Sequence, residues 1–142
     1  MSRTPEPFCC SVTVEFEDVD SYGIAHHSRL VCYLERARLR FIKGLGLELG
    51  PGQVVPVLHD LRVRFSKPVK LLERLDVSVF VESVSDYRLE LGYRIRRGAE
   101  TVLRASTTIA FADLAAGTIV AAPQAYVDAL AAAARTDQDE QA

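Results

Sequence analysis

The stretch "VEFEDVDSYGIAHHSRLVCYLERAR" at residues 14–38 decides the fold, because it joins a strand pattern to a helix pattern through one short polar loop. Before the loop, apolar and polar residues alternate over residues 11–17, which predicts a half-buried strand. After the loop, apolar side chains recur at helical spacing over residues 28–43, and Gly44 and Gly46 then provide a helix stop. The stretch therefore predicts a strand followed by a long amphipathic helix.

Four β-rich runs follow this helix and are separated by short turn signals. Gly98 offers a tight hairpin turn between the last two runs, and Pro123 precedes an alanine-rich segment that favours a short C-terminal helix. We predict an α+β domain in which an antiparallel meander forms one twisted sheet wrapped around one long central helix. The four runs are "VVPVLHDLRVRFSKPV" (54–69), "ERLDVSVFVESVS" (73–85), "YRLELGYRIRR" (87–97) and "ETVLRASTTIAFADL" (100–114).

The chain has 142 residues, a usual length for a single domain with its own hydrophobic core. We predict one domain over residues 1–135. Residues 136–142 are polar and lack an apolar period, so we expect a disordered tail there.

Composition excludes several classes of partner. The formal charge is −2, from 17 basic and 19 acidic residues, and no basic run is long enough to follow a nucleic-acid backbone. No segment approaches the roughly 18 apolar residues that a membrane span needs, and no signal peptide is recognisable. Cys9, Cys10 and Cys32 fit neither a disulfide framework nor a zinc site. We therefore expect a cytoplasmic protein with no nucleic-acid partner and no membrane span.

The polar loop between the predicted strand and helix contains aspartates and histidines, which are common metal ligands. Asp18, Asp20 and Gly23 match three positions of a calcium loop, but Tyr22 and Arg29 occupy positions that need oxygen ligands, so calcium is rejected.

A transition-metal site would use His26 and His27 with Asp18 or Asp20, helped by the His59-Asp60 pair. Adjacent histidines in a regular element point apart, so we predict no metal. A purely structural alternative also stays open, in which Asp20 and His27 only cap the helix and satisfy the turn.

The catalytic interpretation uses the helix end. A helix that begins near Ser28 directs unpaired N–H groups and a partial positive charge toward the loop, where they would hold the oxygen of a polarised carbonyl. Asp20, at the other end of the loop, would then act as nucleophile or as the base that activates water. Gly23 lets the chain turn sharply between them.

These motifs resemble the hotdog-fold acyl-CoA thioesterases of the 4-hydroxybenzoyl-CoA thioesterase family, in particular the branch associated with the bacterial Tol-Pal system. The resemblance rests on residues 14–38 with their "ERAR" ending and on "LRVRFSKPVKLLERLDVSV" at residues 61–79, and it covers roughly residues 11–115. It implies that Asp20 is the catalytic aspartate, and that His27 is the branch's histidine and supplies the backbone N–H that polarises the thioester.

The sequence also departs from the family pattern. Phe16 replaces a frequent tyrosine, and Arg29 and Leu30 replace the usual asparagine and tyrosine after the histidine. Glu35 is the runner-up catalytic carboxylate, since other hotdog thioesterases carry theirs on the helix. Its neighbour Arg36, like Arg38, favours a structural ion pair instead.

Ser28 at the helix start is assigned to substrate binding. So are basic residues in or beside turns, which would hold the phosphates of coenzyme A unless they are only solvated surface charge: Lys67, Lys70, Arg96 and Arg97.

The predicted activity is the hydrolysis of an acyl thioester to free acid and thiol. The resemblance implies no cofactor, with acyl-coenzyme A or the phosphopantetheine arm of an acyl carrier protein as the substrate. It also implies a homodimer with its sheets joined edge to edge, or a homotetramer of two such dimers. The alternatives are a hotdog-fold hydratase or dehydratase, and a non-catalytic module that binds acyl thioesters or carrier proteins.

Overall fold

Strand β1 (Phe8–Thr13) and the 3₁₀ turn η1 (Phe16–Asp18) open the chain in the computed structural model, which describes residues 8–48 and 54–141. The strand predicted over residues 11–17 therefore ends early. Its end is set by a reciprocal capping box, in which Glu15 and Asp18 bind each other's backbone and turn the chain. As a result Phe16 is 81% exposed and is not part of a strand face.

Helix α1 (His27–Gly44) forms where the apolar spacing predicts it. Its buried stripe includes Leu30, Leu34 and Phe41, which recur at helical spacing. The chain leaves the helix through Leu45, and the N–H of Gly46 donates to the carbonyl of Lys43. The predicted helix and its glycine stop are thus confirmed.

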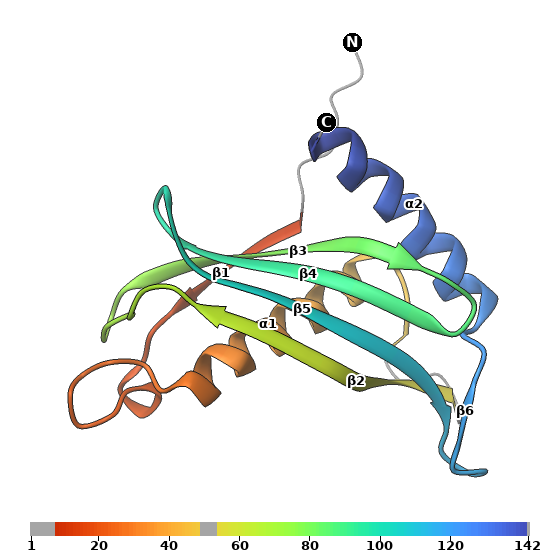
Figure 1. Cartoon of the computed structure of the whole chain (residues 1–142), viewed down its shortest axis with the longest axis horizontal. Coiled ribbons are helices and arrows are strands. Elements are labelled where there is room, and N and C mark those ends of the chain that lie inside the picture. The colour runs from red at the N-terminus through yellow and green to blue at the C-terminus, as the bar shows by residue number, and fades with distance from the viewer. Residues whose placement is uncertain (1–7, 49–53, 142) are drawn as a thin grey trace.

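The four predicted β-rich runs all form strands, and every pairing is antiparallel (Figure 1). The strand order is β1-β3-β4-β5-β2, with β6 paired to β5. The meander prediction holds for β3, β4 and β5, but it is wrong for β2, which crosses to the far edge and pairs with β5. The strands are β2 (Val54–Phe65), β3 (Arg74–Val84), β4 (Arg88–Arg97), β5 (Glu100–Asp113) and β6 (Thr118–Val120).

The predicted hairpin at Gly98 is confirmed. Arg97 pairs with Glu100, and Gly98 has φ +61° at the first position of the two-residue turn, where type II′ turns favour glycine.

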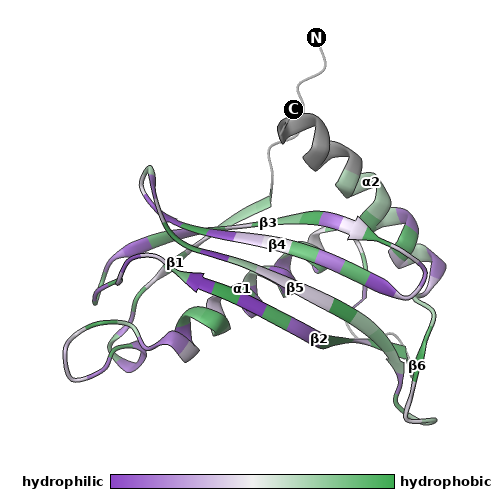
Figure 2. Cartoon of the chain, viewed as in Figure 1, coloured by the Kyte–Doolittle hydropathy of each residue, from purple (hydrophilic) through white to green (hydrophobic). Residues whose placement is uncertain are grey.

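The two faces of the sheet differ sharply in polarity. Figure 2 shows apolar and polar residues alternating along the strands, as expected when one face is buried. On β3 the buried side chains are Leu75, Val77, Val79 and Val81, and they join the same core as the α1 stripe. The intervening residues of β3 point to the opposite face, which is called the outer face below.

A second helix, α2 (Gln124–Gln141), adds to the core through Tyr126 and Leu130, whose side chains are buried. Residues 8–48 and 54–141 therefore contain two α-helices of 18 residues, where one long helix and a short one were predicted. The backbone of α2 continues to Gln141, over residues predicted to be a disordered tail, because extending an existing alanine-rich helix adds one hydrogen bond per residue. None of the helices in the described part of the chain is long and apolar enough to cross a membrane.

We predict that Leu130→Ala lowers the free energy of unfolding by about 2–5 kcal/mol, because the side chain is fully buried and its loss leaves a cavity. Chemical denaturation would measure this. Asp128→Ala is the matched control on the same helix, since it removes only an exposed contact with Gln124 and should cost about 0.5 kcal/mol or less. Equal effects of the two substitutions would contradict the role of Leu130 as the anchor of α2.

Candidate active site

The loop before α1 closes on itself as a miniature hairpin. The N–H of His26 donates to the carbonyl of Asp18 (2.9 Å), and the N–H of Asp20 donates to the carbonyl of Ile24 (2.9 Å). At its tip, the N–H of Gly23 donates to the carbonyl of Asp20 (3.0 Å), and Gly23 has φ +75°. This is the sharp turn for which a glycine was predicted, because side chains disfavour that conformation.

The β2–β3 connection holds the loop from one side. The N–H of Ala25 donates to the carbonyl of Val69 (2.8 Å), and the N–H of Leu71 donates to the carbonyl of Gly23 (3.3 Å). Segments far apart in the sequence thus fix each other's position at the start of α1.

Asp18 anchors the loop from inside the protein. Its side chain is buried, and its Oδ2 accepts hydrogen bonds from the Tyr33 hydroxyl (2.6 Å) and the Glu15 N–H (3.0 Å). The Arg29 Nε lies 3.9 Å from Oδ1. Burial alone would raise the pKa of Asp18, but these hydrogen bonds and the nearby arginines outweigh it and hold the pKa below its ordinary value. Burial and the Asp18 carboxylate together raise the pKa of Tyr33, so this hydroxyl keeps its proton.

Asp20, the predicted catalytic aspartate, is exposed at the loop surface. Its Oδ1 accepts hydrogen bonds from the N–H groups of Tyr22 (2.9 Å) and Ile24 (3.4 Å). Its Oδ2 has no hydrogen-bond partner among the residues that the structure describes. The carboxylate is therefore oriented through one oxygen, and the other stays available for chemistry.

His26, which the sequence analysis assigned only to a rejected metal site, caps α1. Its Nδ1 accepts hydrogen bonds from the N–H (3.2 Å) and the hydroxyl (2.8 Å) of Ser28. Neither Asp20 nor His27 caps the helix, as the structural alternative supposed, because the cap residue immediately precedes the first helical residue. Asp20 does accept hydrogen bonds within the turn, as that alternative also supposed. Ser28 was assigned to substrate binding, but its hydroxyl is engaged in this cap.

His27 is the first residue of α1, so its backbone N–H cannot bond within the helix. In the described part of the chain this N–H has no acceptor. Its imidazole stacks against His26, with ring centroids 4.0 Å apart, and meets the edge of Phe65 at 6.3 Å. A free donor at the positive end of a helix is what an oxyanion requires.

His27 lines one cavity, and a second cavity shares Lys67 and Pro68 with the first as walls. The first, called the apolar cavity, has a volume of about 310 Å³ and is lined by Ile24, Ala25, His27, Leu30, Phe65, Ser66, Lys67, Pro68 and Val69. The second, called the charged cavity, has a volume of about 520 Å³ and is lined by Lys67, Pro68, Lys70, Leu71, Glu73 and Arg97. The surface of the apolar cavity is mostly carbon, whereas the charged cavity is lined by the side chains of Lys67, Lys70, Glu73 and Arg97.

Arg97 in the charged cavity is bound within the chain. Its guanidinium contacts Glu73 (3.0 Å) and Glu100 (2.8 Å), and Lys67 also contacts Glu100 (3.2 Å). The hydrogen bond with Glu100 is the main reason that the pKa of Arg97 is raised. Arg96 is the next residue on β4 and therefore points to the outer face, so the two arginines cannot share one phosphate site.

Glu35, the runner-up carboxylate, is exposed on α1 about 12 Å along the helix axis from His27. The predicted ion pair is wrong: within the described residues Glu35 forms none, and Arg36 instead lies over the Tyr33 ring at 5.9 Å. No group of three or more metal-ligating His, Cys, Asp or Glu side chains is found within residues 8–48 and 54–141.

We predict that Asp18→Asn lowers the free energy of unfolding at pH 7 by about 1–3 kcal/mol, because a buried hydrogen-bonded acceptor loses its charge. The native pKa of Asp18 lies below the ordinary 3.8, so its ionised form adds stability above that pH and loses it as the pH falls through the native pKa. Urea denaturation between pH 7 and pH 3 should therefore show a weaker acid dependence in the variant. Asp20→Asn is the exposed control, and it should leave both quantities nearly unchanged.

Several known proteins resemble this chain in sequence or in fold. A family model described as "Thioesterase-like superfamily" matches residues 14–133. The chain is 27% identical to acyl-CoA thioesterase YbgC of Haemophilus influenzae, over 82% of this chain and 89% of that protein. It is 28% identical to 1,4-dihydroxy-2-naphthoyl-CoA hydrolase of Thermosynechococcus vestitus, over 67% and 68%. A solved structure of a hypothetical protein from Aquifex aeolicus matches with a TM-score of 0.82 and 25% identity, covering 87% of this chain and 99% of that chain. The chain belongs to the Thioesterase-like superfamily.

Proposed function

We propose that this protein hydrolyses acyl thioesters to a free acid and a thiol. The observation that carries the proposal is the N–H of His27 at the N-terminus of α1, which has no acceptor within the described residues and belongs to a residue that lines the apolar cavity. Asp20 lies on the hairpin loop that leads into the same helix. Asp20 itself does not line the cavity, but its loop does through Ile24 and Ala25. A fixed donor and a carboxylate with a free oxygen are the parts that acyl transfer needs.

In this mechanism the thioester carbonyl oxygen accepts a hydrogen bond from the His27 N–H. Negative charge develops on that oxygen when the carbonyl carbon is attacked, and the helix N-terminus stabilises this charge more than it stabilises the neutral substrate. The donor is already positioned by the His26 cap, so it does not have to reorganise during the reaction.

Asp20 has two possible roles. As general base it takes a proton from water, the resulting hydroxide adds to the carbonyl carbon, and the carbon–sulfur bond then breaks to release the thiol. As nucleophile its Oδ2 attacks the carbon and releases the thiol, and water hydrolyses the mixed anhydride that remains. The imidazole of His27 is assigned to orientation of the substrate or to proton transfer to the leaving sulfur.

The substrate class is an acyl thioester of coenzyme A or of a carrier protein's phosphopantetheine arm. The names of the Haemophilus and Thermosynechococcus relatives support coenzyme A thioesters. The apolar cavity would accept the acyl group or the pantetheine chain. The reaction as written needs no cofactor, because water and the two protein groups account for every bond made and broken.

Assembly and family branch complete the proposal. Strand β2 is an edge of the sheet, and a long bare edge invites pairing with another strand. We assign this edge to a homodimer and place the chain in the cytoplasm. We also propose that the protein has a hotdog fold, with α1 as the central helix that the sheet wraps. Within the hotdog thioesterases we assign the protein to the branch associated with the Tol-Pal system.

Asp20→Asn should reduce kcat by about 10² to 10⁴, since asparagine keeps the shape and the turn contacts but can neither take a proton nor attack. His27→Ala should cost less, because the backbone N–H survives the substitution. Hydrolysis of a panel of acyl-CoAs, followed with a thiol reagent, would measure both.

Glu35→Gln is the matched control for a carboxylate on the helix, and it should keep nearly full activity. A kcat above about a tenth of the unmodified value in Asp20→Asn would overturn the mechanism. Loss of activity in Glu35→Gln instead would move the catalytic carboxylate to α1. Tight binding with no thiol release by the unmodified protein would favour a binding module.

Lys70 is the basic residue best placed for the phosphates of coenzyme A, since it lines the charged cavity and has no ion pair within the described residues. Lys70→Ala should raise KM for an acyl-CoA by about two- to fivefold, which is the effect of losing one exposed ion pair with a phosphate. KM for an acyl-pantetheine should stay unchanged, because that substrate lacks the nucleotide phosphates. Arg97→Ala is the comparison variant. Because the Arg97 side chain forms ion pairs with Glu73 and Glu100, its loss should mainly lower the melting temperature. Equal KM effects of Lys70→Ala on both substrates would remove the phosphate site.

A further inference from the structure

Four arginines gather on the outer face of the sheet. The strand registers place Arg94 of β4 opposite Arg104 of β5, and Arg104 opposite Arg64 of β2. Arg96 is two residues from Arg94 on β4 and therefore lies on the same face. These four residues are called the arginine cluster. Like charges directly opposite one another weaken a sheet, so the cluster needs a compensating partner.

The arginine cluster has no anionic partner in the part of the chain that the structure describes. None of its four guanidinium groups forms an ion pair there. Asp76 of β3 lies opposite Arg96, but its carboxylate accepts a hydrogen bond from the Ser11 hydroxyl (3.0 Å) instead. The Nε atoms of Arg94 and Arg96 are buried and have no acceptor among the described residues. These donors therefore call for an acceptor from outside the chain.

The electrostatic environment of Arg94 points the same way. Burial is the main reason that the pKa of Arg94 lies below its ordinary value, and the nearby Arg104 and Arg96 lower it further. A lowered pKa means that the charged guanidinium is destabilised where it stands. An anion beside it would stabilise the charged form, so the centre of the cluster favours a negatively charged ligand.

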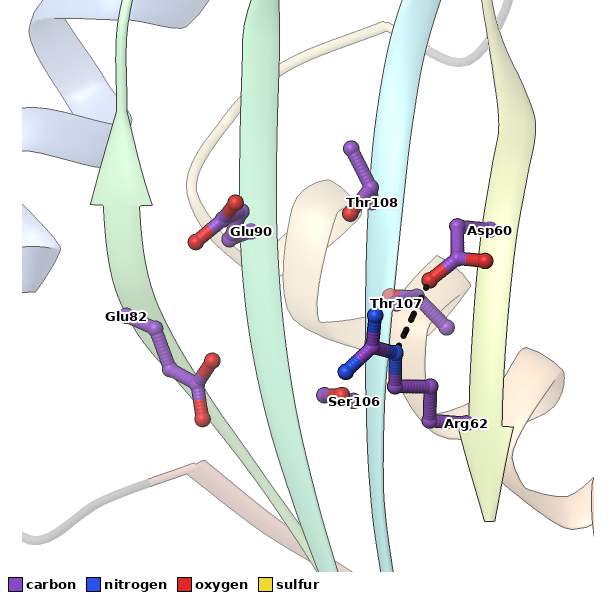
Figure 3. Close-up of a pocket in the computed structure, with 7 residues that line it drawn as sticks. All are labelled: Asp60, Arg62, Glu82, Glu90, Ser106, Thr107 and Thr108. Carbon is purple, nitrogen blue, oxygen red and sulfur yellow. Dashed lines mark ion pairs between the residues drawn. The ribbon is translucent and has the colours of Figure 1, made fainter.

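Acidic residues limit how far such a ligand can extend along the strands. Glu90 of β4 lies opposite Thr108 of β5, which lies opposite Asp60 of β2. Figure 3 shows these side chains and Glu82 of β3 around a hollow of about 290 Å³, with α1 behind the sheet. Glu90 is four residues from Arg94, which is about 13 Å along a strand. An acidic peptide lying along the strands would meet this repulsion, whereas a compact anion would not.

The charge and width of the cluster indicate the valence of the anion. Neighbouring strands are about 4.8 Å apart, so the arginines of β4, β5 and β2 extend over roughly 10 Å across the sheet. Guanidinium groups bind phosphate oxygens through paired N–H donors. One phosphate carries about two negative charges and would leave much of the cluster uncompensated. Two or three linked phosphates match both its charge and its width.

We propose that the arginine cluster binds the di- or triphosphate group of a small phosphorylated ligand. Arg94 and Arg104 hold the phosphates at the centre, and Arg64 and Arg96 extend the site across and along the strands. The site lies on the other side of the sheet from the proposed active site. Phe65 lines the apolar cavity, whereas the preceding residue, Arg64, points to the opposite face. The ligand is therefore separate from the acyl thioester, and the proposal does not depend on the proposed activity.

Binding of sodium pyrophosphate to the full-length chain tests the site. Isothermal titration calorimetry at fixed ionic strength should show one pyrophosphate bound per chain. Arg94→Gln and Arg104→Gln should each raise the Kd by roughly 10- to 100-fold, because each removes a charged hydrogen-bond donor. Arg104→Lys should give an intermediate Kd, since lysine keeps the charge but lacks the paired N–H donors.

Arg88→Gln is the matched control, because it removes an exposed arginine from the same face of β4, on the far side of Glu90. It should leave the Kd for pyrophosphate unchanged. The proposal is overturned if the unmodified chain binds no pyrophosphate, if folded Arg94→Gln and Arg104→Gln bind it as tightly as the unmodified chain, or if Arg88→Gln weakens binding equally. It is also overturned if Lys70→Ala abolishes binding, since the anion then lies in the charged cavity.

The melting temperature gives a second readout. Without pyrophosphate, Arg104→Gln should be at least as stable as the unmodified chain, because it removes a like charge that lies opposite two others. Pyrophosphate should raise the melting temperature of the unmodified chain but not that of Arg104→Gln, because a ligand stabilises only the folded state that binds it. A lower melting temperature in Arg104→Gln with an undiminished rise on adding pyrophosphate would show a purely structural role and overturn the site.

Kinetics distinguish the source of the diphosphate. A free phosphorylated ligand predicts that Arg104→Gln leaves KM for an acyl-CoA unchanged. A rise in KM for the acyl-CoA, but not for an acyl-pantetheine, would assign the diphosphate to the nucleotide end of the substrate and overturn a separate ligand. The binding measurements need no catalytic activity, so they stand even if the proposed hydrolysis fails.

Discussion

The buried hydrogen bond between the Tyr33 hydroxyl and the Asp18 carboxylate is the contact on which the site depends. It joins the second turn of α1 to the turn that follows β1, across 15 residues of chain. Through its carbonyl, Asp18 also holds His26, and His26 in turn caps α1. The same residue thus fixes where the helix begins and where the loop that carries Asp20 ends. A buried carboxylate is tolerated here because every close contact around it is a donor or a cation.

The chemistry at the start of α1 follows from ordinary helix physics. The first residue of any helix has an N–H without an intrahelical acceptor, and water or a side chain usually satisfies it. Here His26 satisfies the N–H of Ser28, and the N–H of His27, a residue that lines the apolar cavity, has no acceptor within the described residues. Catalysis of the proposed kind therefore needs only one further group, a carboxylate, and the hairpin supplies it from the opposite strand of the loop.

The two faces of the sheet differ because side chains alternate along each strand. The apolar side packs with α1 into one core. The opposite side places Arg94 of β4 beside Arg104 of β5, and like charges directly opposite each other weaken a sheet.

The sequence by itself determined the local elements, because the helical period before Gly44 and the two-residue period of the β runs are set by neighbouring residues. It also placed Asp20, Gly23 and His27 in one loop at a helix start, since their spacing is short. Only the tertiary structure decided that β2 pairs with β5, that Asp18 is buried against Tyr33, and that His26 caps the helix. It also showed that the Arg97 guanidinium forms ion pairs with Glu73 and Glu100. These outcomes depend on hydrogen bonds and ion pairs between segments that are distant along the chain, and no local period records such partners.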